Sequence, residues 1–495
     1  MARPFKNPLR VVETARPFFS HPRSLTTDMS TSTSTFDRSG RAQDGQSFSS
    51  SPSTVLPKVT KPIPGMAPLS IIPLSSLLRS IVINSISSSR ILLPPSLIIM
   101  SVLAHSNSRL LNPDQNPLLR FFLKKTFYAQ FCAGENPHEV QHKIKSLKDM
   151  GFKGVMLGYA KEVVLDEKAS KALESGKDNA AAEYCIQNEI LPWRDGTLQT
   201  VSMAEPGDFV SIKFTGAGSQ ALFDLSRQNE PSLALNDAIT TICDLAASRG
   251  VRLLFDAEQQ SLQAGIDAWV MSYMRRYNDR IPGKAVIYNT YQCYLKSAPK
   301  MLAQHLSIAR KDGLTFGAKL VRGAYLGSDP RHLINDTKAE TDANYDSIAE
   351  SLMRRQYGAA LKPADGETEQ PFPQVNVVLA GHNHTSVRKA LAIRTSQAER
   401  GEERVDMVYA QLQGMADEVS CELLQAAAVE KSEKNKIDVP QAYKYLVWGT
   451  TGECMKYLLR RAQENKDAVQ RTREGRDAML KELLRRSTAM FGRSV

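Results

Sequence analysis

The chain of 495 residues is poor in cysteine, and its cysteines form no pattern. None of the six lies in a CxxC pair; they are Cys132, Cys185, Cys243, Cys293, Cys421 and Cys454. Zinc sites of the finger and ribbon types need such pairs, and disulfide frameworks need cysteines concentrated in a short secreted chain. The cysteine content therefore argues against both and fits a reducing compartment.

A long uninterrupted apolar run is also missing. Residues 68–104 are rich in Leu, Ile and Ser, but Arg79 and Arg90 interrupt them, and Pro94-Pro95 would break a helix in the longest uncharged stretch. A membrane-spanning helix needs about 20 predominantly apolar residues. We therefore expect packed or membrane-surface helices here, with a transmembrane helix as the alternative.

Basic residues outnumber acidic ones, but they do not form a nucleic-acid-binding pattern. The net charge is +11, and no basic patch with interleaved aromatic residues occurs, so no nucleic-acid partner is expected. Part of the excess lies in residues 1–27, which hold five basic residues and one acidic residue. Because this composition is typical of a mitochondrial transit peptide, we interpret residues 1–27 as one, with a disordered basic tail as the alternative.

Composition divides the rest of the chain into four parts. Residues 28–62 are dominated by Ser, Thr, Gly, Gln and Pro and are predicted to be a disordered linker. Residues 63–150 carry mainly helical patterns and form a helical N-terminal region. Residues 151–466 alternate between strand-like and helix-like segments, and residues 467–495 are predicted to be a basic C-terminal helix.

Eight short apolar runs in the third part are predicted to be strands. They lie at residues 153–157, 209–214, 251–255, 285–289, 316–321, 374–379, 405–411 and 443–447. Helical patterns separate them, at residues 233–248, 261–280, 299–311, 336–356, 386–394 and 415–430. This alternation predicts an α/β fold whose parallel sheet closes as a (β/α)8 barrel, with an open doubly wound sheet as the runner-up.

Polar side chains stand at the C-terminal ends of several predicted strands. They are Lys213, Asp256, Gln292, Lys319, Arg322, His382, Asn383 and Gln413. In (β/α)8 barrels the active site is built at that end, and unpaired buried charge is costly. We therefore expect these residues to meet in one site at that end of the barrel.

Two further motifs in the barrel region favour neither a Rossmann unit nor a metal. Gly216-Ala-Gly218-Ser-Gln-Ala221 matches the G-x-G-x-x-G/A fingerprint, but the acidic residue expected about 20 positions later is missing. Any flavin would therefore bind in another way, across the barrel mouth. His382 and His384 lie two residues apart, but no third ligand is evident, so no metal site is predicted.

The run from Tyr445 to Asn465 contains an unusual helix face. Thr450 and Glu453 form a capping box, which predicts that a helix begins there. Tyr457, Arg460, Arg461 and Glu464 then lie on one face of that helix. Two guanidinium groups could hold the carboxylate of a small amino acid while the tyrosine packs on its apolar part. A solvated basic face with a Glu salt bridge is the alternative.

Six segments carry a family resemblance, in the family's order. They are Phe255-Asp256-Ala257-Glu258, Tyr291-Gln292, Lys319-Leu-Val-Arg322-Gly323-Ala324-Tyr325-Leu326, Gly381-His382-Asn383, Gln411-Leu-Gln413-Gly414-Met415-Ala416-Asp417 and the run from Tyr457 to Asn465. Together they resemble proline dehydrogenase, the FAD enzyme that starts mitochondrial proline oxidation, over about residues 120–470. Bacterial members often have Arg and Lys where this chain has Lys319 and Arg322, so the order here looks like the eukaryotic mitochondrial branch.

The resemblance implies a role for each matched residue. Asp256, which would order Lys213, and Lys319 would be the catalytic-site residues. The substrate-binding residues would be Lys213, Tyr325, Tyr445, Tyr457, Arg460 and Arg461, with Glu464 bracing the arginines. The FAD contacts would be Ala257, Gln292, Arg322, Gly323, Ala324, Gly381, His382, Asn383 and Gln413. Gly323 would permit close approach of the backbone to the flavin.

The resemblance also implies where the last helix lies. In a regular barrel this helix runs down the outside, which would leave Arg460 about 14 Å from the mouth at about 1.5 Å per residue. For the arginines to meet a substrate the helix must lie across the barrel mouth, as it does in the family.

The implied function is oxidation of L-proline to Δ1-pyrroline-5-carboxylate by hydride transfer to flavin N5, with electrons passed to a quinone. The implied location is the matrix side of the mitochondrial inner membrane, in peripheral contact with it. Hydroxyproline dehydrogenase is the closest rival, although its members tend to carry a smaller residue where Tyr445 stands. A catalytically silent membrane-associated scaffold with the same fold is the other alternative.

Overall fold

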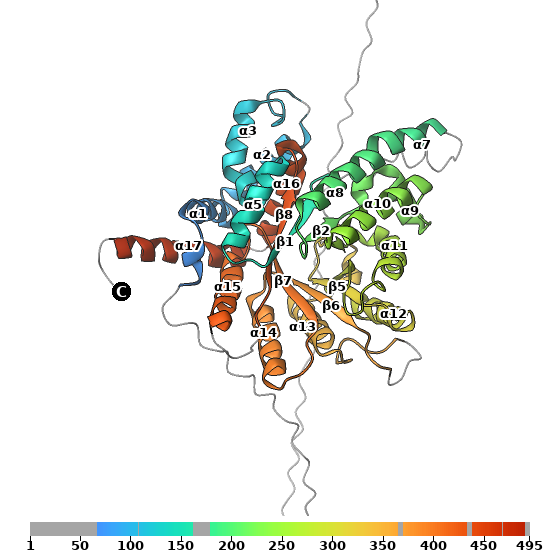
Figure 1. Cartoon of the computed structure of the whole chain (residues 1–495). Helices are drawn as coiled ribbons and strands as arrows, with labels where there is room; N and C mark the ends of the chain where they lie inside the picture. Colours follow the sequence, from blue (N-terminus) through green and yellow to red (C-terminus); the bar gives the residue numbers. More distant parts are fainter. Residues whose placement is uncertain are drawn as a thin grey trace, which may run out of the picture. The chain divides into compact units, whose positions relative to one another are not determined.

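Eight parallel strands close into a barrel in the order of the sequence (Figure 1). The computed structural model describes residues 67–106, 108–161, 179–364, 370–432, 438–467 and 469–490. The strands are β1 (Gly154–Tyr159), β2 (Phe209–Ile212), β3 (Arg252–Phe255), β4 (Ile287–Gln292), β5 (Phe316–Val321), β6 (Val375–Ala380), β7 (Asp406–Leu412) and β8 (Ala442–Trp448). Because β8 pairs in parallel with β1, the predicted (β/α)8 barrel is confirmed and the open doubly wound sheet is excluded.

Alternate residues of each strand enter two different cores, as the pleat of a strand requires. Met156 of β1 and Tyr443 of β8 belong to a cluster inside the barrel. Their neighbours Val155 and Leu157 instead join the larger core between the strands and the surrounding helices. Both sets are buried, which explains why the strands have continuous apolar runs rather than a polar side.

Helices and short turns follow the strands and surround the barrel (Figure 1). They are α7 (Asn179–Cys185), η3 (Ile186–Ile190), α8 (Leu191–Met203), η4 (Phe214–Ala217), α9 (Ser219–Arg227), α10 (Leu233–Arg249), α11 (Gln260–Tyr277), α12 (Ala298–Lys311), η5 (Arg331–Leu333), α13 (Lys338–Arg354), α14 (His384–Glu399) and α15 (Asp417–Ser432). The six predicted helices are all present, with ends that differ by a few residues.

Side-chain contacts explain the two largest differences at helix ends. α11 ends at Tyr277, before the predicted residue 280, because the Asn278 side chain bonds the backbone of Val286, Ile287 and Thr315 and so draws the chain away. α14 continues to Glu399, beyond the predicted residue 394, because its last turn is held by the buried Gln397, whose amide donates to the Met353 carbonyl (3.2 Å).

The described part of the N-terminal region is helical, as predicted. Its elements are η1 (Pro68–Ile71), α1 (Leu74–Ser88), α2 (Leu93–His105), α3 (Pro117–Leu123), η2 (Lys124–Tyr128), α4 (Ala129–Phe131) and α5 (Pro137–Asp149). The chain ends in α16 (Thr451–Asp467) and α17 (Val469–Met490). α1 packs against α17, and α2 packs against α16. The predicted transit peptide (1–27) and linker (28–62) lie outside the described residues.

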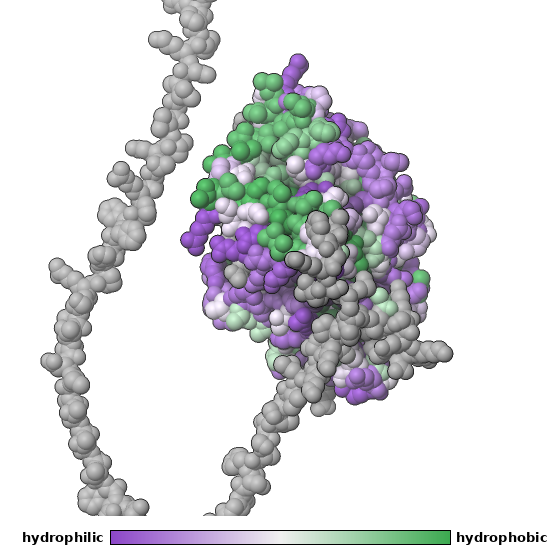
Figure 2. Space-filling model, turned by 90° about the vertical axis from the view of Figure 1, so that its left-hand side faces the viewer, coloured by the Kyte–Doolittle hydropathy of each residue, from purple (hydrophilic) through white to green (hydrophobic). Residues whose placement is uncertain are grey.

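An apolar surface distinguishes this region from the barrel. Figure 2 shows apolar residues gathered on one face of the molecule. Within the described ranges each helix taken alone falls short of the length and apolarity that a membrane crossing needs; α1 and α2 reach them only together, across a bend of 105°.

Candidate active site

The predicted site residues meet at one end of the barrel. Because all strands are parallel, their carboxyl ends lie together, and each polar residue singled out in the sequence lies at such an end. Lys213 follows β2, Asp256 follows β3, Gln292 ends β4, Lys319 lies within β5, Arg322 follows β5, His382 and Asn383 follow β6, and Gln413 follows β7. The topology therefore places these positions toward one end of the barrel.

Asp256 is the centre of a hydrogen-bonded cluster drawn from four strands. Its Oδ1 accepts from Lys319 Nζ at 2.5 Å, and its Oδ2 accepts from Ser211 Oγ at 2.7 Å and Tyr445 OH at 3.0 Å. The Lys319 ammonium also lies 5.3 Å from the centre of the Tyr445 ring. We call Ser211, Asp256, Lys319 and Tyr445 the Asp256 cluster.

The electrostatics of the Asp256 cluster fix its protonation. Burial alone would raise the pKa of Asp256, but the charges of Lys319 and then Lys213, with hydrogen bonds from Lys319 and Ser211, hold that pKa below its usual range. Burial and then the Asp256 charge raise the pKa of Tyr445 well above its ordinary value. At neutral pH Asp256 is therefore a carboxylate and Tyr445 a neutral donor. A carboxylate whose pKa is lowered and whose oxygens already accept hydrogen bonds is a weak base. Asp256 is therefore better placed to orient Lys319 and Tyr445 than to remove a proton.

The Asp256 cluster contains two contacts that the sequence-based expectation did not include. Asp256 makes an ion pair with Lys319, and the charge of Lys213, which Asp256 is expected to order, also lowers the pKa of Asp256. Ser211 was missed altogether. It lies two residues before Lys213 and so faces the same side of β2, which is the one signal that could have identified it.

α16 begins as predicted and lies over the carboxyl ends of strands. In its capping box Glu453 N donates to Thr450 Oγ1 (3.2 Å), and Thr450 N donates to Glu453 Oε2 (2.8 Å). Its buried side joins an apolar cluster with Ala160 after β1, Met415 after β7 and Val447 of β8. Its main contacts are with α2, α1 and η2, and none of these belongs to the outer ring of the barrel. This placement fits a helix across the mouth.

The aromatic and basic residues of α16 are buried rather than solvated. Tyr457 lies in the same apolar cluster as Tyr445 and is close enough to contribute to its raised pKa. The Arg461 guanidinium lies 5.1 Å from the centre of the Tyr457 ring, and Arg461 is only 7% exposed. Arg460 is half-buried. The bracing role expected for Glu464 concerns a side chain outside the described residues.

A buried donor and a buried acceptor remain unused at the ends of β5 and β7. Arg322 donates from Nε to Asp342 (2.7 Å) and from Nη2 to Ser386 (2.8 Å), whereas its buried Nη1 has no hydrogen-bond partner in the described part of the chain. Nη1 lies near Gly381, where an added Cβ would be 3.4 Å away. The buried Oε1 of Gln413 likewise has no partner there. Such orphan groups need an explanation, and a polar ligand would supply one.

Other predicted flavin contacts already order the loops around the mouth. Gln292 accepts from Ala324 N (3.0 Å) and donates to the Glu258 carbonyl (3.3 Å), which links the loops after β3 and β5. His382 Nε2 accepts from Leu412 N (3.1 Å), and Asn383 caps α14 by accepting from Ser386 N (3.2 Å). Ala257 is buried after β3, and Tyr325 is half-buried in the loop after β5, beside Tyr294.

Gly323 has a reason to be glycine that the sequence did not show. Its φ is +150°, and an added Cβ would lie 2.5 Å from the Tyr294 ring. The packing of this tyrosine, rather than approach to a flavin alone, therefore requires glycine at this position.

The fingerprint at Gly216 and the histidine pair have structural partners. A Rossmann fold would bind phosphate at the start of α9. Here that position is taken by a carboxylate of the protein, because Ser219 N donates to Glu189 Oε2 (2.7 Å). His384 Nε2 lies 2.5 Å from Glu422 Oε2, away from the His382 contact. Across the described ranges, no three His, Cys, Asp or Glu residues are grouped as metal ligands.

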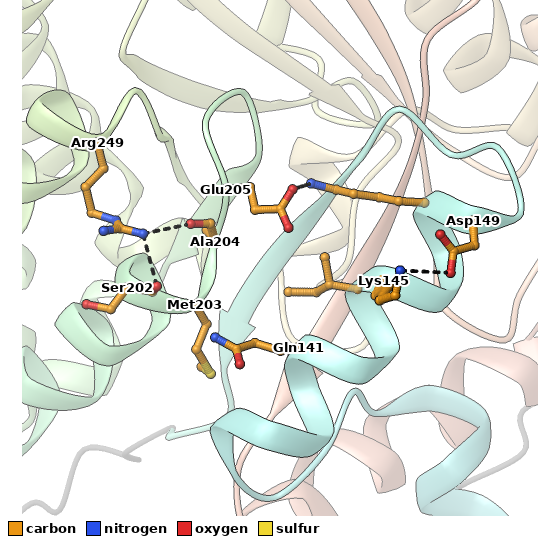
Figure 3. Close-up of a pocket in the computed structure, with 10 residues that line it drawn as sticks. Gln141, Lys145, Asp149, Ser202, Met203, Ala204, Glu205 and Arg249 are labelled. Carbon is orange, nitrogen blue, oxygen red and sulfur yellow. Dashed lines mark hydrogen bonds and ion pairs between the residues drawn. The ribbon is translucent and has the colours of Figure 1, made fainter.

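A cavity of about 510 Å³ lies at the opposite end of the barrel, between α5 and the end of α8 (Figure 3). Its basic side chains are engaged within the protein. Lys148 pairs with Glu205 (2.7 Å), and Arg249 donates to the carbonyls of Ser202 (3.1 Å) and Ala204 (3.3 Å). Since none of the predicted site residues lines it, the cavity does not compete with the mouth as the candidate active site.

Comparisons with known proteins match the same part of the chain. The model of the family described as "Proline dehydrogenase" matches residues 140–474. A probable mitochondrial proline dehydrogenase of Schizosaccharomyces pombe is 30% identical over 415 residues, covering 75% of this chain and 80% of the relative. Proline dehydrogenase 1 of Caenorhabditis elegans is 36% identical, covering 60% and 45%, and hydroxyproline dehydrogenase of Xenopus laevis is 30% identical, covering 74% and 79%.

Solved structures share the fold. Proline utilization A from Bdellovibrio bacteriovorus, inactivated by N-propargylglycine, aligns with a TM-score of 0.54 at 18% identity, covering 79% of this chain and 38% of that chain. The structural likeness at this identity concerns the fold, whereas the family match covers most of the sequence. The chain belongs to the proline dehydrogenase family.

Proposed function

We propose that this protein is a mitochondrial, FAD-dependent L-proline dehydrogenase that forms Δ1-pyrroline-5-carboxylate. The observation that carries the proposal is the meeting of the Asp256 cluster with Tyr457 and Arg461 at the carboxyl end of the barrel. Family membership and the curated mitochondrial relatives support the reaction and the location.

The residues of α16 would bind the substrate. Arg460, Arg461 and Lys213 would hold the proline carboxylate, since guanidinium groups bind carboxylates bidentately and gain strength away from water. Tyr445 and Tyr457, already in one apolar cluster, would form the wall along the pyrrolidine ring, together with Tyr325. Ordering the ring and the carboxylate at once would place the carbon next to nitrogen in a fixed position, which is how a protein lowers the entropic part of a barrier.

The unused polar atoms at the mouth fit a polar cofactor such as FAD. Arg322 Nη1, which lies near Gly381, and Gln413 Oε1 would form hydrogen bonds with it. The other FAD contacts that the resemblance implies would lie around them; they are Ala257, Gln292, Gly323, Ala324, His382 and Asn383. The chemistry that FAD supplies when bound is two-electron acceptance at N5, after which a quinone would receive the electrons. Lys319, fixed by Asp256, would hold a positive charge where negative charge develops during oxidation.

The direct test is product formation by the purified full-length holoprotein. With L-proline and a soluble quinone, mass spectrometry should find a product two hydrogens lighter than proline, and D-proline should give none. Flavin-loaded protein that forms no such product would contradict the proposal. A higher kcat/KM with hydroxyproline would favour the second candidate, hydroxyproline dehydrogenase, which the Xenopus relative keeps open.

Tyr445 is expected to set the choice between these two substrates. Tyr445→Ser should lower kcat/KM for L-proline and raise the hydroxyproline-to-proline ratio by roughly tenfold, because losing the ring opens space for a hydroxyl. Tyr445→Phe is the matched control, since it keeps the ring and loses only the bonds to Asp256 and Ser211. Equal ratios in the two variants would show that Tyr445 does not face the pyrrolidine.

We also propose that α1–α3 form the surface that contacts the inner membrane on its matrix side (Figure 2). Of the twenty exposed large hydrophobic residues in the described chain, thirteen lie between Leu74 and Phe122. No acidic residue occurs from 67 to 113, while Arg90 and Arg109 are exposed there. Apolar helices with basic residues are typical of segments that lie in the interface of an anionic bilayer.

Flotation with lipid vesicles tests this surface. The full-length protein should float with vesicles that contain cardiolipin, and the double change Phe121→Ser and Phe122→Ser should weaken binding by about two to four orders of magnitude, at about 1.5–3 kcal/mol per buried phenylalanine. Leu233→Ser is the control, because Leu233 is 90% exposed but lies on α10, outside this surface. Equal losses in both proteins, or no flotation of the wild type, would refute the assignment.

A further inference from the structure

Two carboxylates from the N-terminal region hold the start of α16. Asp114 Oδ1 accepts from Gly452 N (2.9 Å), and its Oδ2 accepts from Thr450 Oγ1 (3.0 Å). Glu135 Oε1 accepts from Thr451 N (2.9 Å) and Thr451 Oγ1 (2.7 Å). We call Asp114 and Glu135 the α16 clamp. The first N–H groups of a helix have no acceptor within the helix. Here the α16 clamp and the capping box together give each backbone N–H from 450 to 453 a side-chain acceptor.

Glu135 is itself fixed by basic residues of α3 and η2. Arg120 Nη2 lies 2.8 Å and Lys124 Nζ 2.6 Å from Glu135 Oε2, and the Glu135 side chain is only 3% exposed. Burial alone would raise the pKa of Glu135, but hydrogen bonds from Arg120, Lys124 and Thr451 outweigh it and lower the pKa to about 2. Glu135 therefore remains charged at neutral pH. Its negative charge lies at the N-terminus of α16, where it interacts favourably with the positive end of the helix dipole.

The absence of a side chain at Gly452 leaves room for the Asp114 carboxylate. A Cβ added at this glycine would lie 2.2 Å from Asp114 Oδ2, so the carboxylate occupies the space of a side chain. Alanine favours a helix more than glycine does. The glycine at this position in α16 is therefore explained by Asp114 and not by the helix itself.

The α16 clamp bonds the first turn of the helix, at a distance from the arginines. From Gly452 to Arg460 and Arg461 the helix rises roughly 12–14 Å, at about 1.5 Å per residue. A change of tilt at Gly452 would therefore move the guanidinium groups by about an ångström or more, which would lengthen their hydrogen bonds to the proline carboxylate and weaken substrate binding.

We infer that Asp114 and Glu135 are positioning residues for proline, which fix the direction of α16 and so the places of Arg460 and Arg461. The inference rests on the proposed function for its substrate. Asp114 bonds the first turn of α16, and Glu135 bonds that turn together with Arg120 and Lys124, whereas the arginines lie in the middle of the helix.

Steady-state kinetics of the full-length holoprotein separate this role from simple capping. Asp114→Ala should raise KM for L-proline about tenfold, with kcat and flavin content within twofold of the wild type. Asp114→Asn should restore KM to within about threefold, since its oxygen can still accept from Gly452 N. Gly452→Ala should behave like Asp114→Ala despite its better helix propensity. Unchanged KM in both alanine variants would overturn the inference.

A matched control and a second readout complete the test. Thr337→Ala removes a comparable cap from α13 and should lower stability while leaving KM unchanged. A tenfold rise in KM in this variant would show that any loss of stability has this effect.

Hydrogen exchange needs no substrate, and amides of residues 454–461 should exchange faster in Asp114→Ala than in the wild type. If the wild type fails to oxidise proline, the proposed function fails, while unchanged exchange in Asp114→Ala would overturn the clamp independently.

Discussion

Replacing Arg461 or Arg460 with methionine should lower kcat/KM for L-proline by two or more orders of magnitude, while the fold and bound FAD largely survive. Surface ion pairs contribute about 0–1 kcal/mol, but losing one partner of a buried charge pair costs about 3–5 kcal/mol. Arg461 belongs to the second class because it is 7% exposed and lies over the Tyr457 ring. At about 1.4 kcal/mol per factor of ten, the buried case corresponds to a hundredfold loss or more.

The control for these variants is an arginine whose own side chain is half-exposed and whose carboxylate partner keeps a second arginine, Arg486. Arg485 of α17 pairs with Glu482 at 2.8 Å, and its side chain is 48% exposed. Arg485→Met should therefore change kcat/KM by less than about twofold. Normal proline binding by both the Arg460 and Arg461 variants would mean that the basic face of α16 does not meet the substrate.

Lys319→Met should both destabilise the protein and slow its oxidation of proline. The change leaves the buried Asp256 carboxylate without its ion-pair partner, a loss that costs about 3–5 kcal/mol in the free energy of unfolding. The rate of flavin reduction should fall more than proline affinity does, because the lysine charge matters most as negative charge develops. Stopped-flow reduction and denaturant unfolding measure the two effects separately.

A double variant separates charge pairing from catalysis. Lys319→Met combined with Asp256→Leu removes both charges, so stability should largely return while the reduction rate stays low. An unchanged reduction rate in Lys319→Met with a raised Kd for proline would instead assign Lys319 to the substrate. A single variant as stable as the wild type would contradict the ion pair itself.

The same pair predicts a pH dependence of stability. The folded-state pKa of Asp256 lies below its unfolded value of about 3.9, so its contribution is present above that pH and is lost as the pH falls through the folded pKa. The difference in unfolding free energy between the wild type and Lys319→Met should therefore be largest at neutral pH and should shrink below about pH 4. Unfolding curves at several pH values measure it.

The fold was predictable because most strands coincide with short apolar runs in the sequence. β5 lies where its apolar run predicts it, at Phe316–Val321. β4 is the clearest exception, since it runs from Ile287 to Gln292 whereas the apolar run covers 285–289. Its last residues are polar because they end in the site, and Ala285 is held outside the strand by the Asn376 side chain. An apolar pattern alone does not mark a strand that ends in a polar site.

The positions of the site residues were predictable, but their partners were not. The order of parallel strands identifies which residues share an end of the barrel. The Asp256–Lys319 pair instead joins β3 to β5 with β4 between them, and Tyr445 reaches both Ser211 and Asp256 from β8. These contacts depend on closure of the barrel, and the α16 clamp depends on residues more than 300 positions away in the sequence.

The central claim is that the mouth of this barrel brings L-proline to a bound flavin, and anaerobic titration tests it most directly. L-Proline added without oxygen to the purified full-length protein, while absorbance is followed near the visible flavin maximum, should bleach the flavin completely, whereas D-proline should leave it oxidised. Protein that carries flavin and keeps its full visible absorbance in excess L-proline would contradict the account.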